Sequence, residues 1–138
     1  MMPVVASPSK HISQSIARPA SEVYEYVSMP ANLPEWASSL AGSVQQVDGR
    51  WVAESPMGLV VIAFVPSNDH GVLDHDVTLP SGETVHNPMR VIAAGGGSEV
   101  VFTLRRAPGM TDEEFTRDAA TVSADLAALK RVLEARSR

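Results

Sequence analysis

Residues 111–136 read TDEEFTRDAATVSADLAALKRVLEAR, and this closing stretch decides what the rest of the fold must accommodate. Its first four residues form a capping box, in which the Thr111 hydroxyl and the Glu114 carboxylate each accept a hydrogen bond from the other residue's backbone. Apolar residues then recur at alternating four- and three-residue spacing, as in an amphipathic helix. These residues are Phe115, Ala119, Val122, Leu126, Leu129 and Leu133. At about 1.5 Å per residue the helix is roughly 37 Å long, enough to cross a whole sheet.

Segments with a period of two residues fill most of the chain before that helix, and they predict β-strands. In the clearest of them, residues 72–79, Leu73, His75 and Val77 alternate with polar or charged residues. Turn-forming residues such as Asp48-Gly49 separate these segments at intervals of about 10–15 residues, which indicates an antiparallel meander. The predicted strands are residues 11–17, 43–47, 50–55, 59–65, 72–79, 83–94 and 99–106.

Two short helices are predicted between the first and second strands. Pro19 suits the first turn of one helix, because its fixed φ angle is helical, and apolar residues at helical spacing follow it. This helix should end before Pro30, whose ring disfavours the helical conformation at the preceding residue. Pro34 then begins a second short helix, which carries Trp36.

This order of elements resembles the helix-grip fold of the START and birch-pollen-allergen superfamily (SRPBCC). The resemblance lies in residues 16–24 (IARPASEVY), residues 32–36 (NLPEW) and the helix from Phe115 to Leu133. It is greatest with small bacterial members described as polyketide cyclase/dehydrase. It implies an α+β fold, in which a curved antiparallel sheet of about seven strands wraps around the C-terminal helix. It also implies a deep cavity between sheet and helix that binds lipids, sterols, polyketides or other aromatics.

Composition narrows the classes of protein that fit. The 138 residues, 44% apolar and 20% charged, suit one globular domain, which we expect at residues 10–138 after a loose leader at residues 1–9. The net charge of −5 disfavours nucleic acids and anionic membranes as partners. The longest apolar run, residues 59–65, is far shorter than the roughly 20 residues that span a bilayer. We therefore expect a cytoplasmic protein with no integral membrane segment.

His75 is the main candidate for chemistry, because the alternation of its strand places it on the apolar face. A buried imidazole is suited to act as a general acid or base, or to anchor a ligand carbonyl or hydroxyl. The alternative is a core histidine with one satisfied hydrogen bond. The neighbouring Asp74 and Asp76 point to the opposite face, so their carboxylates do not converge with the imidazole. We therefore expect neither a metal site nor a cofactor.

Five further residues are candidates for the wall of the cavity. Asn87 shares its strand phase with Met89, so its amide is expected to point inward, although Pro88 also allows a turn or bulge there. Trp36 and Trp51 are large rings with one polar atom each, suited either to gripping an apolar ligand or to core packing. The complete candidate set is Trp36, Trp51, His75, Asn87, Met89 and Phe102.

Three functions from different classes agree with these features. The first is binding of a small hydrophobic ligand, as a carrier or a sensor. The second is a polyketide-type cyclase or dehydratase, in which His75 transfers a proton and Asn87 holds a carbonyl. The third is an assembly module, in which Val60, Ile62 and Phe64 leave apolar area exposed on the outer sheet face and form a homodimer. Both a monomer and a homodimer agree with the sequence.

Overall fold

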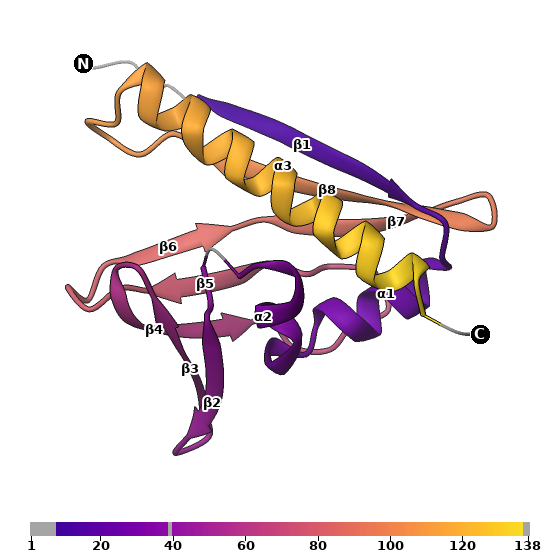
Figure 1. Ribbon diagram of the computed structural model, residues 1–138, viewed down its shortest axis with the longest axis horizontal. Coiled ribbons are helices and arrows are strands. Elements are labelled where there is room, and N and C mark those ends of the chain that lie inside the picture. The colour runs from indigo at the N-terminus through magenta and orange to yellow at the C-terminus, as the bar shows by residue number, and fades with distance from the viewer. Residues whose placement is uncertain (1–7, 39, 137–138) are drawn as a thin grey trace, which may run out of the picture.

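The computed structural model describes residues 8–38 and 40–136 (Figure 1). Residues 1–7 of the predicted leader lie outside the described residues, and the first strand already begins at Ser9. The N-terminal elements are β1 (Ser9–Ile16), α1 (Ala20–Val27), the 3-10 helix η1 (Pro30–Asn32) and α2 (Leu33–Trp36). The remaining elements are β2 (Ser43–Val47), β3 (Arg50–Ser55), β4 (Gly58–Phe64), β5 (His75–Thr78), β6 (Thr84–Asn87), β7 (Met89–Ala94), β8 (Gly97–Arg105) and α3 (Asp112–Glu134).

The strands form two antiparallel sheets, with the orders β1-β8-β7 and β2-β3-β4-β5-β6. The described residues hold eight strands rather than about seven, because the strand predicted at residues 83–94 is divided at Pro88. Proline has no backbone N–H for a ladder hydrogen bond, so β6 and β7 continue in different sheets. The predicted α+β helix-grip architecture, with a long C-terminal helix against curved antiparallel sheets, is confirmed.

The strand predicted at residues 72–79 is shorter than its alternation indicated. Val72 forms a bridge with Arg90 of β7, and the Leu73 amide donates to the Met89 carbonyl at 2.8 Å. These residues therefore join the edge of the other sheet, and β5 begins only at His75. The segment links the two sheets into one curved layer at this point.

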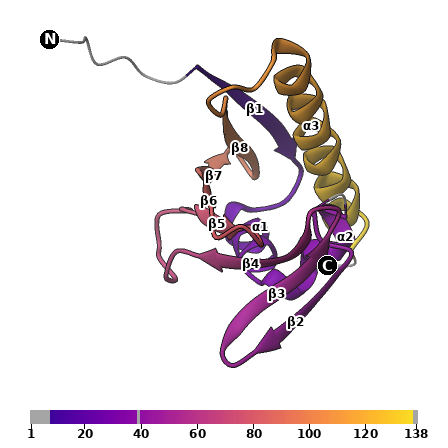
Figure 2. The same ribbon diagram turned by 90° about the vertical axis from the view of Figure 1, so that its left-hand side faces the viewer.

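Helix α3 lies across β1 and β8 and packs at its C-terminal half against α2 (Figures 1 and 2). Its predicted capping box is present, with the Thr111 hydroxyl 3.1 Å from the Glu114 amide and the Glu114 carboxylate 2.9 Å from the Thr111 amide. At the other end, the buried guanidinium of Arg18 donates to the carbonyls of Glu134 and Arg136, each at 2.9 Å. Both ends of the helix are therefore capped by side chains. No helix among the described residues has the length and hydropathy to span a membrane.

The outer-face assignment of Val60, Ile62 and Phe64 is wrong. Val60 and Ile62 are fully buried in the core, and Phe64 is half-buried. The cause is register, because Ile62 pairs with Val77, which faces the core. The exposed residue of this strand is Leu59, with 60% of its surface accessible. The apolar outer patch that the assembly hypothesis required is therefore not formed by these three residues.

Candidate functional site

The five-stranded sheet has an inward side that we call the concave face. The register places several rows of cross-strand neighbours on it, and two of these rows reach β5 and β6. They are the first row, Trp51, Ile62, Val77 and Val85, and the second row, Phe64, His75 and Asn87. Because side chains alternate along a strand, every member of both rows points toward the interior of the fold.

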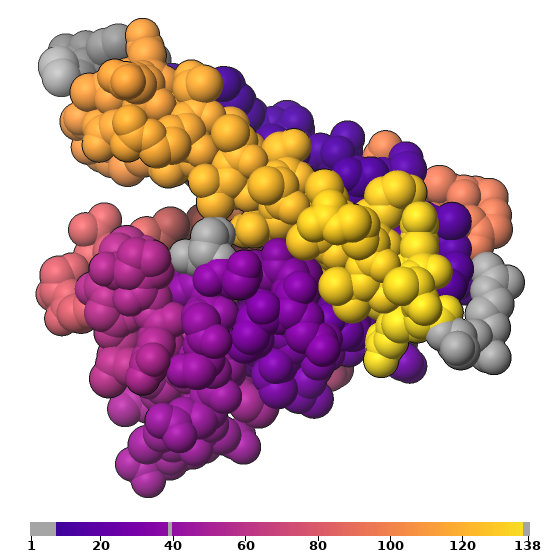
Figure 3. All heavy atoms as spheres, in the orientation of Figure 1, coloured from indigo at the N-terminus to yellow at the C-terminus, as the bar shows by residue number. Residues whose placement is uncertain are grey.

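Helix α3 leaves part of this face uncovered. It packs on β1, β8 and α2, and its N-terminal half stands away from β5 and β6 (Figures 1 and 2). Figure 3 shows the surface hollowed between this half of α3 and the five-stranded sheet. We call this hollow the cleft. It opens at β6, where Val85 is 40% exposed although its neighbour Val77 on the same face is only 4% exposed.

His75 points inward, as its strand phase predicted, and is buried. Its Nδ1 lies 3.0 Å from the carbonyl oxygen of Leu73. Its ring stacks on Phe64, with centroids 4.7 Å apart, and is tilted against Phe102 at 6.1 Å. Burial lowers the pKa of His75, since a charged imidazolium is poorly solvated there, and this outweighs the opposing effects of the Leu73 carbonyl and of Asp74. The imidazole is therefore neutral at pH 7, and among the described residues its Nε2 makes no hydrogen bond.

Asn87 lies directly opposite His75 in the antiparallel pairing and is half-buried. Its inward direction agrees with the strand phase, and Pro88 ends β6 immediately after it. The structure thus brings an amide, which can both donate and accept, beside an imidazole on the concave face. Phe102, a buried residue of β8, meets the same imidazole from the neighbouring sheet.

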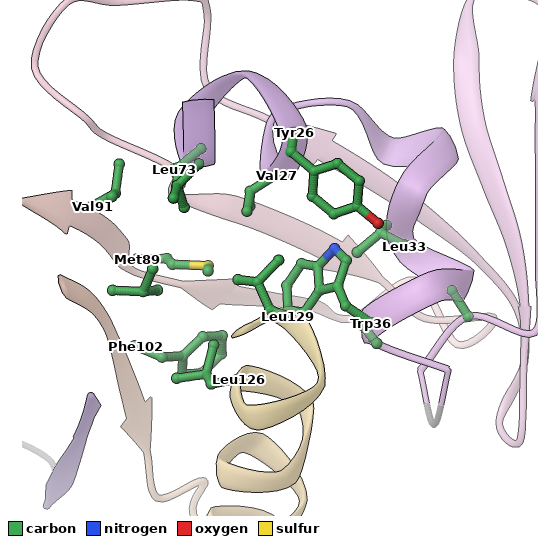
Figure 4. Packing of buried hydrophobic residues seen from close by; sticks show 14 of the residues in the cluster. Tyr26, Val27, Leu33, Trp36, Leu73, Met89, Val91, Phe102, Leu126 and Leu129 are labelled. Atoms are coloured by element: carbon green, nitrogen blue, oxygen red, sulfur yellow. The ribbon is translucent and has the colours of Figure 1, made fainter. Parts of the chain in front are cut away.

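Three of the candidate residues belong to the packed layer beneath α3. In Figure 4, Met89 points toward Leu129, Phe102 lies beside Leu126, and the Trp36 indole lies next to Leu129. Met89 is fully buried, and Trp36 and Phe102 nearly so. The Trp36 Nε1 is buried without a hydrogen-bond partner among the described residues. Phe102 contributes to both the core and the histidine cluster, whereas Trp36 and Met89 are core residues in this structure.

Trp51 stands apart from that cluster. It is half-buried at the β3 end of the concave face and lines a hollow of about 380 Å³ together with Pro30 and Phe64. Because Phe64 also stacks on His75, this hollow and the histidine cluster share one wall. The structure therefore places Trp51 on the same face as His75 but two strands away, on β3 rather than β5.

Sequence reasoning missed a second hollow, of about 610 Å³, which lies between α1, residues 68–71 and β7. The Tyr24 hydroxyl accepts from the Asn68 amide at 3.0 Å and fixes this loop. Gly71 adopts a φ of +69° and passes so close to the Val91 carbonyl that no side chain fits. The three walls come from distant parts of the chain, so no local pattern signalled this hollow. Sequence reasoning also missed that Phe64 lies on the same face of the sheet as Val77. A correct assignment of this face would have identified Phe64 as the aromatic neighbour of His75.

The acidic residues beside His75 have partners on the outer face. Asp74 accepts from the Met89 amide at 2.9 Å and pairs with Arg90, and Asp76 lies 2.6 Å from Nδ1 of His86. Within the described part of the chain, no group of three histidine or acidic side chains could hold a metal ion. These carboxylates therefore bind the strands together, away from the concave face.

Comparisons with known proteins agree with this geometry. The structure is similar to XoxI from Bacillus cereus (15% identity, TM-score 0.70, 93% of this chain and 99% of that chain). It is also similar to the Aha1 dimer from Colwellia psychrerythraea (13% identity, TM-score 0.72, 93% of this chain and 97% of that chain). A third similar structure is a START superfamily protein from Mycobacterium smegmatis (12% identity, TM-score 0.69, 91% of this chain and 97% of that chain). At such identities the likeness shows the fold alone. None of the curated proteins compared with this chain matches it in sequence.

The sequence itself supplies the family. A family model described as polyketide cyclase / dehydrase and lipid transport matches residues 9–134, nearly the whole chain. The match spans β1 through α3 and so includes both sheets and the helix that crosses one of them. The chain therefore belongs to the polyketide cyclase/dehydrase and lipid transport family, the group with which the sequence resemblance was greatest.

Proposed function

We propose that this protein binds a small hydrophobic ligand, such as a lipid, a polyketide or another aromatic, in the cleft, as a carrier or a sensor. The observation that carries the proposal is the partial exposure of an inward apolar face, with Val85 at 40% beside Val77 at 4%. Burying apolar surface is favourable by about 25 cal/mol per Å². A ligand that covered the exposed part of this face would therefore bind with a favourable free energy. The lipid-transport description of the family supports the same class of ligand.

The candidate residues have distinct places in this proposal. Phe102 and His75 form the inner end of the cleft, where rings meet and little water enters. Asn87 adds a polar group beside the mouth. Met89 and Trp36 form the layer behind Phe102 (Figure 4), where the flexible thioether can move to admit a longer ligand. Trp51 extends the apolar face toward β3.

A matched pair of variants tests the cleft. Val85 and Leu59 are both exposed apolar residues of the five-stranded sheet, but Val85 lies on the concave face and Leu59 on the opposite face. In a fluorescence titration with 8-anilinonaphthalene-1-sulfonate, we expect Val85→Asp to weaken binding at least tenfold, because a buried carboxylate loses hydration. Leu59→Asp should bind as the wild type does. Equal affinities in both variants would contradict the proposal.

A cyclase or dehydratase acting on such a ligand is a second candidate, favoured by the neutral imidazole of His75. A free Nε2 can take a proton from a substrate, and Asn87 beside it can hold a carbonyl. With a panel of aromatic polyketides, His75→Ala should retain binding while product formation falls by a factor on the order of 10² to 10⁴. A carrier forms no product in the wild type either, which separates the two candidates.

A further inference from the structure

We infer that the cleft selects ligands that carry a hydrogen-bond donor, such as a phenol or an alcohol, and that this donor binds Nε2 of His75. The inference rests on the proposed function, because it names the chemical class of ligand for the same cleft. The sequence alone allowed either a carbonyl or a hydroxyl of the ligand as the partner of the imidazole. The inference selects the hydroxyl.

The tautomer of His75 follows from the only hydrogen-bond partner that its ring has among the described residues. A carbonyl oxygen can only accept a hydrogen bond, so Nδ1, 3.0 Å from the Leu73 oxygen, carries the ring proton. A neutral imidazole has one N–H, and Nε2 is therefore an acceptor. Leu73 cannot turn this carbonyl away easily, because its amide donates to Met89 at 2.8 Å and its side chain is buried.

The surroundings hold the ring in this state. Phe64 stacks on one side and Phe102 is tilted against it, so a flip that exchanges the two nitrogens would displace aromatic rings on both sheets. The titratable groups that influence the pKa of His75 are Asp74, Asp76 and His86. The pairs that Asp74 and Asp76 form with Arg90 and His86 lie on the outer face. Burial keeps the imidazole uncharged despite the two carboxylates, because it lowers the pKa of His75.

As a consequence, the inner end of the cleft favours ligands with a hydrogen-bond donor over ligands that have only acceptors. An ether, ketone or carboxylate would set an acceptor against the Nε2 lone pair and leave both groups unsatisfied in an apolar site. A hydroxyl on a flat apolar body donates to Nε2 while its body lies among the rings. The hydroxyl oxygen can then accept from the Asn87 amide on the neighbouring strand. Discrimination of this kind is strong where a buried polar group would otherwise lack a partner.

The test compares 2-naphthol with 2-methoxynaphthalene, which share an apolar body but differ in the donor. Isothermal titration calorimetry gives the ratio of their Kd values in the wild type and in His75→Phe, with His11→Phe, an exposed histidine of β1, as the control. We expect the preference for 2-naphthol to be about three- to tenfold larger in the wild type and in His11→Phe than in His75→Phe. An identical preference in all three proteins overturns the inference but leaves ligand binding intact. Absence of binding by both probes contradicts the proposed function itself.

A measurement on the wild type alone avoids any folding defect of a variant. Long-range ¹H–¹⁵N correlation spectra identify which nitrogen of His75 is protonated. We expect the proton on Nδ1, and a shift of the Nε2 resonance on addition of 2-naphthol but not of 2-methoxynaphthalene. A protonated Nε2 in the free protein, or equal responses to both probes, would overturn the inference.

Discussion

The two sheets carry the same alternation of inward and outward residues, yet they differ in what covers them. On the three-stranded sheet, under α3, the inward residues Met89 and Val100 are fully buried. On β6 of the five-stranded sheet, the inward Val85 is 40% exposed, because α3 stands away from it. An inward phase therefore does not by itself make a residue part of the core. Where no element covers such a residue, a ligand can take the place of the missing neighbour.

The largest effect should come from removing core volume on the covered side. Leu129 of α3 is fully buried against Trp36 and Met89 (Figure 4), so Leu129→Ala should lower the free energy of unfolding by about 2–5 kcal/mol. Val85→Ala, at the open side, should change it by less than about 0.5 kcal/mol. Urea unfolding measures both. A loss at Val85 as large as that at Leu129 would mean that β6 is packed as tightly as the covered sheet.

The Arg18 cap at the C-terminal end of α3 gives a second comparison between a buried and an exposed interaction. Arg18→Ala removes the donors to the carbonyls of Glu134 and Arg136 and should cost about 1–3 kcal/mol. Arg117→Ala removes an exposed pair with Glu113 and should cost less than about 0.5 kcal/mol. Amide exchange should accelerate in the last turn of α3 only in Arg18→Ala. Equal exchange in both variants would show that α3 holds its position without this cap.

A pH series isolates His75, which the proposed function places at the inner end of the cleft. Burial lowers its pKa below 6.5, so at acid pH the unfolded chain binds a proton that the folded chain does not. The free energy of unfolding should therefore be unaffected by His75 above pH 6.5 and fall as the pH drops below it, by at most about 1.4 kcal/mol per pH unit. His75→Phe should lack this component, whereas His11→Phe should keep it. Parallel pH profiles for the wild type and His75→Phe would place the imidazole in water.

The smallest effect should come from the outer face of the five-stranded sheet. Leu59→Asp changes an exposed side chain and should alter stability by less than about 0.5 kcal/mol. If ligand binding is the function, light scattering should give the same mass for this variant and the wild type. A smaller mass for the variant would instead favour assembly through this face, with Leu59 in the role that the sequence assigned to Ile62.

Strong local signals explain which parts of the fold could be predicted. The capping box located the start of α3, and Asp48-Gly49 located the hairpin, whose strands β2 and β3 have the predicted bounds. Long-range pairing explains the errors. The segment at Val72 and Leu73 pairs with β7, and Pro88 separates two sheets, neither of which the alternation of residues reveals.

The candidate site shows the same limit. The inward phase of His75 was predictable, because its strand alternates cleanly, and the structure confirms it. The phase of Phe64 was not, since residues 56–58 interrupt the pattern at the start of β4 and only the pairing of β4 with Val77 and His75 of β5 defines it. The exposure of Val85 depends on which strands α3 packs against. This is a property of tertiary packing, and no single segment of the sequence determines it.

The most direct test of the central claim is where an apolar ligand makes contact. Intermolecular NOEs between 2-naphthol and methyl-labelled protein report this, because both the cleft and the 610 Å³ hollow contain methyl groups. Binding in the cleft predicts NOEs to the methyl groups of Val85 and Val77. NOEs to Val91 and Ile92 without any to Val85 would place the ligand in the other hollow and contradict the account.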